Sequence, residues 1–249
     1  MTAPRYVYAI GRAVDPTDLA GLVGIDGAEV HRISHRDLVA VVSAAPADED
    51  ALRSRLERLD ELAVLAEVHH AVVAAIAAQT VVVPFRLATI YRDEDRVREV
   101  LRQRYEEFEA LLDRLAGTVE IGIKLYVEDR QPAPAAPSTS GRAYLQQLSQ
   151  RHRRRDEKWQ HAAAAVERVD TALGACAIDR SRHRPQAAQL SGAAGDNVLN
   201  AAYLVPAGRL TEFTDLAQRL ALDEPALRVE VTGPWAPYSF TESDHGDRP

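Results

Sequence analysis

The chain contains few of the residues that usually reveal a protein's chemistry. Its 249 residues include a single cysteine, Cys176, which excludes an intrachain disulfide and fits a reducing cytoplasm. No apolar run approaches the roughly 20 residues of a membrane helix or forms a signal peptide at the N-terminus, so we expect neither. The formal net charge of -7 argues against a general nucleic-acid binder, which would be basic.

Catalytic and metal-binding patterns are missing as well. No glycine-rich phosphate loop follows a strand, and no G-x-S-x-G elbow is present. His69 and His70 are neighbours in a helical pattern, so their side chains point about 100° apart; we expect one to face the core and one to face solvent. His31 and His35 alternate with arginines that would repel a cation. We therefore expect no catalytic residue, no cofactor and no metal, and a protein that is not an enzyme.

What the chain does have is a regular series of helical and strand patterns. Residues 46–79 predict one long helix whose buried stripe includes Leu59. Residues 93–117 predict a second amphipathic helix that stops at Gly117, and residues 141–173 predict a third. Strands are predicted over residues 5–11, 28–34, 37–43, 81–83, 119–128, 174–178, 197–205 and 227–232, and a last helix over residues 209–221.

The order of these elements predicts an α+β protein with two domains and an extended tail. From residue 119 onward the order is β-α-β-β-α-β, which is that of a ferredoxin-like unit. The first half is also α+β, but its order matches no common unit. We place an N-terminal α+β domain over residues 1–117, a ferredoxin-like domain over residues 118–232 and a C-terminal tail over residues 233–249.

The segment VVVPFRLATIY, residues 81–91, is the first candidate contact surface. It places Arg86 next to Phe85 in an otherwise apolar run. A buried arginine needs a carboxylate or carbonyl partner, and the acidic helix starts at residues 48–50 and 93–95 offer one. The two interpretations of Arg86 are a partly buried ion pair within the protein and a contact with a partner.

The segment TGPWAPYSF near the C-terminus is the second candidate. It carries Trp235, Tyr238 and Phe240 between prolines, which keep the backbone extended and out of a sheet ladder. An extended segment with so many aromatic residues either packs across its own protein as a latch or binds a partner.

Several segments together resemble the gas vesicle protein F/L family (GvpF/GvpL). They occur in the family's order from about Tyr6 to Phe240 and read YVYAIG, DLVAVVS, VVVPFRLATIY, VEIGIKLYVE, GRAYLQQ, NAAYLV and LRVEVTGPWAPYSF. One departure follows Arg86, where the family usually has phenylalanine and glycine and this chain has Leu87 and Ala88. The resemblance implies an α+β N-terminal domain, a modified ferredoxin-like C-terminal domain and a C-terminal tail.

The resemblance also implies a function. Proteins of this family are non-catalytic accessory proteins of gas vesicles, the protein-shelled, gas-filled compartments that give buoyancy to some prokaryotes. They act in assembly by binding the small hydrophobic shell protein (GvpA-type) and other accessory proteins, and some are minor components of the vesicle. We expect a location at the gas vesicle in the cytoplasm, with neither nucleic acid nor membrane as a partner. The residues that we expect to contact a partner are Val83, Phe85, Arg86, Trp235, Tyr238 and Phe240.

Two other functions stay open from the residues alone. An enzyme or small-ligand binder would use the ferredoxin-like half and a closed pocket lined by residues such as Lys124, Tyr126 and Tyr203. A nucleic-acid-associated regulator would use the basic run RHRRR at residues 151–155. Acidic residues follow that run directly, so a solvated helix face and a dock for an acidic partner are its other interpretations.

Overall fold

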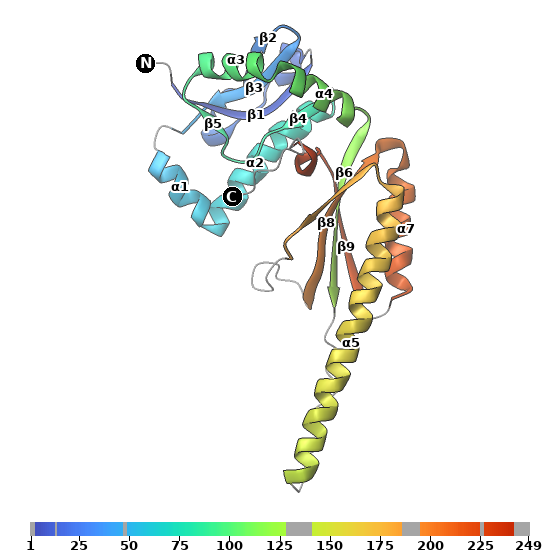
Figure 1. Ribbon diagram of the computed structural model, residues 1–249. Coiled ribbons are helices and arrows are strands. Elements are labelled where there is room, and N and C mark those ends of the chain that lie inside the picture. Colours follow the sequence, from blue (N-terminus) through green and yellow to red (C-terminus); the bar gives the residue numbers. More distant parts are fainter. Residues whose placement is uncertain are drawn as a thin grey trace. The chain divides into compact units, whose positions relative to one another are not determined.

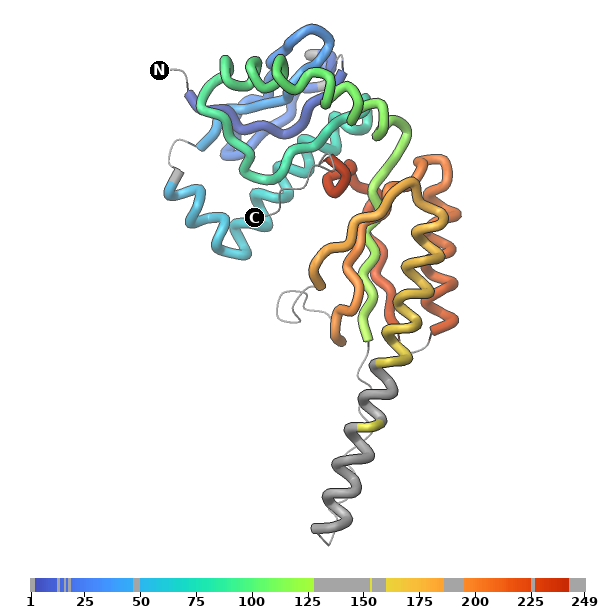
Figure 2. Tube along the Cα trace, in the orientation of Figure 1, coloured from blue at the N-terminus to red at the C-terminus, as the bar shows by residue number. Residues whose placement is uncertain are grey.

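Two β-sheets, each covered by helices, make up the computed structural model, which describes residues 3–12, 14–46, 49–127, 141–185, 195–224 and 227–241 (Figures 1 and 2). The chain divides into two compact units. Unit 1 consists of Met1–Glu120 and Trp235–Pro249, and unit 2 consists of Ile121–Pro234. The chain therefore leaves unit 1 once and returns to it near the C-terminus.

The sheet of unit 1 is built around its first strand. It has the order β2-β3-β1-β4, β5 also pairs with β1, and all these pairs are antiparallel. The first strand is apolar along its length and buried on both faces, which suits a central position. The strands are β1 (Arg5–Arg12), β2 (His31–His35), β3 (Leu38–Ala44), β4 (Val82–Pro84) and β5 (Ile90–Tyr91).

Helices cover both faces of this sheet (Figure 1). One face packs against α2 (Leu59–Ala77), which follows α1 (Glu49–Glu57). The other face packs against α3 (Glu94–Gln103) and α4 (Tyr105–Leu115). Short 3-10 turns, η1 (Pro16–Leu19) and η2 (Ile25–Gly27), connect β1 to β2. The side chains that α2 contributes to the core are Leu65, His69, Val72, Val73 and Ile76.

The single helix predicted over residues 46–79 is wrong. Arg58 has extended backbone angles (φ -99°, ψ 118°) and separates α1 from α2, while Leu59 is 66% exposed instead of buried. Leu52 and Leu65 both reach the same core cluster. In one straight helix these two side chains would point about 140° apart, so the break is what lets both be buried. The helix predicted over residues 93–117 is also interrupted, by a turn at Arg104 (φ -107°, ψ 24°).

Unit 2 has a four-stranded sheet in the order β7-β8-β6-β9. Two helices, α5 and α7, pack against one another and against β8 (Figure 1). Along the chain the elements are β6 (Thr118–Val127), α5 (Gly141–Cys176), β7 (Asp179–His183), β8 (Asp196–Pro206), the 3-10 turn η3 (Ala207–Arg209), α7 (Leu210–Leu222) and β9 (Leu227–Trp235), and the 3-10 turn η4 (Tyr238–Phe240) follows in unit 1.

The strand predicted over residues 174–178 is also wrong. Those residues include the end of α5, and Cys176 is half-buried there. The strand is instead β7, in a segment that was expected to be a loop. Its arginines, Arg180 and Arg182, pair with Asp170 of α5, whose side chain is fully buried. These ion pairs with α5 take the place of apolar contacts, so the sequence of β7 lacks the apolar alternation that would mark a strand.

Three predicted segments fall outside the described residues in whole or in part. They are the stretch between the strand predicted to end at residue 128 and the helix predicted to start at residue 141, the last part of the tail at residues 242–249, and most side chains of the basic run at residues 151–155. Of that run the side chain of Arg153 is described, and it is exposed.

Candidate functional site

The two segments singled out in the sequence meet around one histidine of α2. His69 occupies a core-facing position of the helix and is 3% exposed. His70, the next residue, is half-buried, and its ring lies 4.7 Å from that of Trp235. The expectation of one core-facing histidine is confirmed by His69, whereas His70 contacts the tail. Tyr6 and Tyr238 contact the imidazole of His69. We call these three residues the His69 cluster.

Hydrogen bonds from His69 join the first strand to the turn after β4. The imidazole Nδ1 lies 3.0 Å from the Tyr6 hydroxyl, and Nε2 lies 3.0 Å from the carbonyl oxygen of Phe85. The backbone N–H of Ala88 donates to the same Tyr6 hydroxyl at 2.9 Å. Because a carbonyl can only accept, Nε2 carries the proton, and the Tyr6 hydroxyl donates to Nδ1. All these polar atoms are satisfied when His69 is neutral.

Burial holds the members of this network in their neutral forms. Loss of hydration lowers the pKa of His69 to about 4, against a weaker opposing effect from the Phe85 carbonyl. Burial likewise raises the pKa of Tyr6 well above its usual range. Protonation of His69 would place a second donor on the Tyr6 hydroxyl and leave the tyrosine proton without an acceptor. The cluster is therefore a structural device that works in one protonation state.

Between β4 and β5 the chain turns out of the sheet. The turn starts with Phe85 N–H donating to the Tyr8 carbonyl and ends with Val7 N–H donating to the Thr89 carbonyl. Ala88 has φ 62°, in the left-handed region that favours glycine. The same conformation suits glycine, which the resemblance described above leads us to expect at this position.

Of the two interpretations of Arg86, the partly buried setting is not found. The residue is exposed, and its carbonyl accepts hydrogen bonds from the N–H and the hydroxyl of Thr89. At the acidic start of α3, Asp93 caps the helix and Glu94 pairs with Arg5. Arg86 thus lies on the surface of the turn, where a partner could reach it.

The other two predicted residues of this stretch lie deeper. Val83 is 3% exposed and forms part of the core. Phe85 is half-buried, with its ring 6.3 Å from that of Phe108. These residues support the turn from below, whereas Arg86 marks its outer side.

The described part of the tail packs on α2 as a latch, which is one of the two roles expected from its sequence. Residues 235–241 place Ala236 in the core and leave Phe240 4% exposed. The Tyr238 ring lies 6.1 Å from His69, and its hydroxyl is buried without a hydrogen-bond partner among the described residues. Trp235 contacts His70 edge-on at 4.7 Å and is 38% exposed. The latch therefore buries most of its aromatic surface and presents one face of Trp235.

Glu120 fixes the latch in place. Its carboxylate accepts hydrogen bonds from the backbone N–H of Ser239 at 2.7 Å and from the Ser239 hydroxyl at 2.8 Å. Glu120 is 8% exposed, and burial raises its pKa although these hydrogen bonds oppose the change. Sequence patterns missed this residue because it looked like the polar side of an alternating strand. Nothing local signals a partner that follows 119 residues later.

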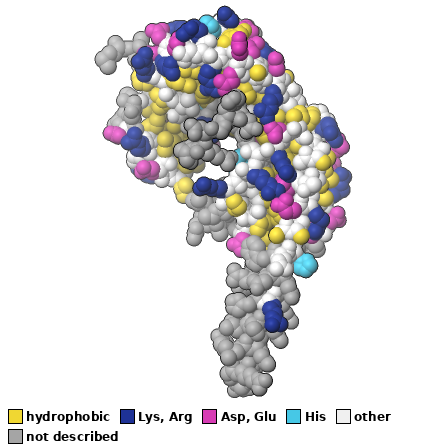
Figure 3. Space-filling view, in the orientation of Figure 1, with side chains coloured by type: hydrophobic (Ala, Val, Ile, Leu, Met, Phe, Trp, Pro, Cys, Tyr) yellow, Lys and Arg dark blue, Asp and Glu magenta, His cyan; other side chains and the backbone are white. Residues whose placement is uncertain are grey.

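The outer surface of α3 and α4 has a different character. Positively charged arginines and negatively charged carboxylates are interspersed over it (Figure 3). They pair within the helices at a spacing of three or four residues, as in Arg98 with Glu94, Arg102 with Glu99 and Arg104 with Glu107. This is the pattern of a solvated helix face.

The residues proposed for a small-ligand pocket do not converge. The Tyr203 hydroxyl donates to the buried Asp170 of α5 at 2.5 Å. Lys124 instead pairs with Glu230 of β9, and Tyr126 lies under the guanidinium of Arg228. Within the part of the chain that is described, no three histidines, cysteines or carboxylates come together as metal ligands. Over the same residues, every helix is too short or too polar to cross a membrane.

Comparison with known proteins gives a consistent result. The family model "Gas vesicle synthesis protein GvpL/GvpF" matches residues 4–242. Gas vesicle protein L of Streptomyces sp. (strain CB03234) is 46% identical over 95% of this chain and 92% of its own length. Gas vesicle protein F of the same strain is 28% identical over 95% and 99%. The crystal structure of GvpF from Anabaena sp. PCC7120 has a similar fold, with a TM-score of 0.67, 17% identity and full coverage of both chains.

Proposed function

The chain belongs to the gas vesicle synthesis protein GvpL/GvpF family, and from that premise we propose that it is a non-catalytic accessory protein that binds the hydrophobic shell protein during vesicle assembly. Its role is in gas vesicles. We further propose an L-type member, since identity to the L protein exceeds identity to the F protein of the same strain (46% against 28%). Other accessory proteins are its further partners, at the vesicle in the cytoplasm.

The exposed face of Trp235 carries this proposal. A large aromatic side chain that is 38% exposed, beside buried neighbours in a fixed latch, offers an apolar contact at little entropic cost. It contacts His70 of α2, a helix that also exposes two apolar side chains, Val64 (56% exposed) and Leu59 (66% exposed). Such a surface suits a partner that is itself strongly apolar and needs cover until it assembles. In this scheme Val83, Phe85, Tyr238 and Phe240 hold the surface in shape, while Arg86 and Trp235 touch the partner.

The domain description follows the same line. We propose an N-terminal α+β domain over residues 1–117, a modified ferredoxin-like domain over residues 118–232 and a tail over residues 233–249. The β-α-β-β-α-β order and the sheet order β7-β8-β6-β9 support the ferredoxin-like assignment. Residues 235–241 of the tail pack as part of unit 1.

A pull-down with purified shell protein tests the proposed function. We expect the full chain to retain the shell protein, and Trp235→Ala to lower retention about tenfold, as for a residue at the centre of an interface. Leu222→Ala is the matched control, because Leu222 is an exposed apolar residue of unit 2 (80% exposed). Absence of retention by the unchanged chain, in an assay where a known partner is retained, would sink the proposal.

Arg86→Ala separates contact from folding. Because Arg86 is exposed, the variant should keep the melting temperature of the unchanged chain and lose part of its retention of shell protein. A variant that unfolds instead would show that Arg86 serves the fold, and one that binds fully would remove it from the contact surface.

A further inference from the structure

The sheet of unit 1 ends in two edges of different kinds. On one side β4 and β5 are short, Pro84 has no N–H to offer, and the turn between them interrupts the line; these features protect an edge from pairing. On the other side β2 has five residues in regular register with β3, without a proline or a bulge. Among the described residues, no strand pairs with the outer side of β2. The outward backbone groups of β2 are therefore the ones that a further strand would pair with.

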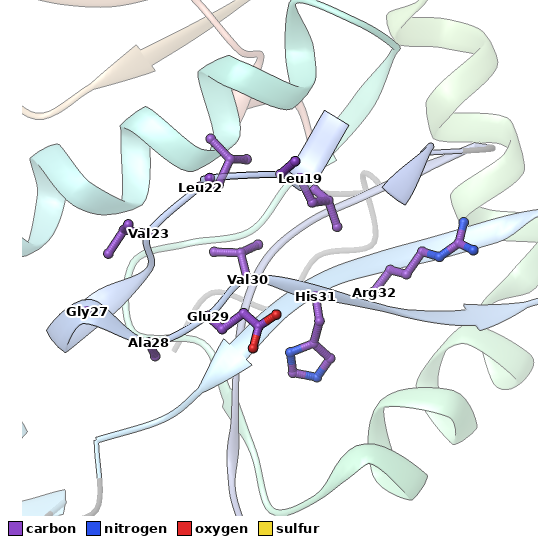
Figure 4. Close-up of a pocket in the computed structure, with 11 residues that line it drawn as sticks. Leu19, Leu22, Val23, Gly27, Ala28, Glu29, Val30, His31 and Arg32 are labelled. Atoms are coloured by element: carbon purple, nitrogen blue, oxygen red, sulfur yellow. The ribbon is translucent and has the colours of Figure 1, made fainter. Parts of the chain in front are cut away.

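A pocket of about 500 Å³ lies beside the start of this edge. Val30 points to the side of the chain that carries Leu19 and Leu22, whereas Glu29 and His31 point to the other side (Figure 4). Leu19 and Val30 are themselves nearly buried, so the pocket has a firm apolar floor. A strand laid along β2 would place alternate side chains on the two sides of the edge, and those on one side would enter the pocket.

Two exposed arginines, Arg32 and Arg36, lie along the edge, with His31 and His35 half-buried beside them. Carboxylates lie there as well, since Glu94 is 3.5 Å from His31 and Asp37 follows Arg36. The guanidinium of Arg32 donates to the backbone carbonyl of Val14 at 3.1 Å and lies near Asp15. The guanidinium of Arg36 stacks over the ring of Tyr105 at 4.8 Å. Glu29, just before the strand, forms a single bridge with Val23. Like charges would disfavour pairing of two copies of this edge, and carboxylates on an added strand would be favoured.

We propose that the outer edge of β2 takes an extended segment of a partner protein by strand addition, with an apolar side chain in the Leu19–Leu22–Val30 pocket and acidic side chains facing Arg32 and Arg36. Backbone hydrogen bonds supply the affinity, and the pocket and the charges supply the specificity. This site is separate from the Trp235 surface. It stands whether or not the chain binds the shell protein, because its occupant is defined by the edge alone.

Selection from a random peptide library displayed on phage tests the proposal on the full chain. The enriched peptides should carry an apolar and an acidic residue two positions apart, because Val30 and Arg32 lie on the same side of the edge. When synthesised and bound, they should slow amide hydrogen exchange at residues 29–35. Arg32→Glu should weaken their binding about tenfold by fluorescence anisotropy. Arg102→Glu, the same change at an exposed arginine of α3, should leave it unchanged.

Other outcomes overturn the proposal. A library without binders, enriched peptides that are basic or helical, or protection that falls away from β2 would each do so. A dimer that protects β2 without peptide would make a second copy the occupant instead. If Arg32→Glu does not fold, Arg36→Glu provides the same measurement at an exposed arginine in the turn between β2 and β3.

Discussion

A buried polar cluster of unit 1 and one of unit 2 differ in charge. In unit 1 the neutral His69 links Tyr6 to the Phe85 carbonyl. In unit 2 the ionised Asp170, 0% exposed, is shared by Arg180, Arg182 and the Tyr203 hydroxyl. The first cluster holds a turn against a strand by donor–acceptor matching alone. The second holds an edge strand, β7, by charge. The neutral cluster is therefore sensitive to protonation, and the ionic cluster is sensitive to the loss of a charged partner.

Removing both arginines from the ionic cluster should have the largest effect. Arg180→Ala with Arg182→Ala leaves the Asp170 carboxylate buried with only Tyr203 as a partner, which should lower the free energy of unfolding of unit 2 by about 3–5 kcal/mol. Hydrogen exchange of amides in β7 and β8 measures this separately from unit 1. Arg209→Ala, at an exposed arginine of the same unit, is the control. An effect no larger than that of the control would mean that Asp170 is not held by its arginines.

Acid should weaken the neutral cluster next. The folded pKa of His69, about 4, lies below the unfolded value of 6.5, so the unfolded chain binds the proton more readily. Stability from this group is fully present above pH 6.5 and falls as the pH drops to about 4, by at most about 3 kcal/mol. Urea unfolding across this range, followed by exchange of unit 1 amides, measures the slope. His69→Gln keeps a donor and an acceptor without titrating, so an unchanged slope in that variant would contradict the assignment.

Asp170→Asn sharpens the comparison, since it removes the charge and keeps the shape. Arg180 and Arg182 are about half exposed and can turn to water, so only Tyr203 loses a strong acceptor. We expect a loss of about 1–3 kcal/mol, less than for the double arginine variant. The same exchange experiment compares them, and a larger loss for Asp170→Asn would reverse our view of which partner carries the burial cost.

The smallest effect should come from the latch. Ser239→Ala removes the hydroxyl that donates to Glu120 and keeps the backbone N–H that donates to the same carboxylate. We expect a loss of about 0.5–1.5 kcal/mol in unit 1 and none in unit 2. Thr241→Ala, beside it, is the control. Loss of exchange protection across all of unit 1 would instead show that the latch decides the folding of the unit.

Periodicity predicted most helices and strands but not where they bend or end. The apolar stripe of residues 46–79 continues across Arg58, so no local pattern marks the break; it is set by the shared core that Leu52 and Leu65 reach. For β7 the opposite holds. Its arginine-rich sequence has no strand pattern, because the arginines are held by Asp170, which lies ten residues before Arg180 on α5.

The segments that form the candidate site were predictable from the sequence, but the contacts between them were not. The aromatic tail, the Pro-Phe-Arg stretch and the histidine pair are each visible in the sequence. Their contacts join residues far apart, 63 positions for Tyr6 with His69 and 119 for Glu120 with Ser239. A buried histidine must find hydrogen-bond partners, but one chain does not reveal which residues they are.

The return of the chain to unit 1 sets the order in which the protein can mature during synthesis. Ala236 and Tyr238 complete a core whose other members lie more than 100 residues earlier, and all of unit 2 is translated in between. A nascent chain still attached to the ribosome before residue 235 has an unfinished first unit, however long it waits. A prematurely ended product lacks both the Glu120 contact and Trp235. The apolar surface proposed for the shell protein is thus assembled only after residue 235 and the rest of the latch have been translated.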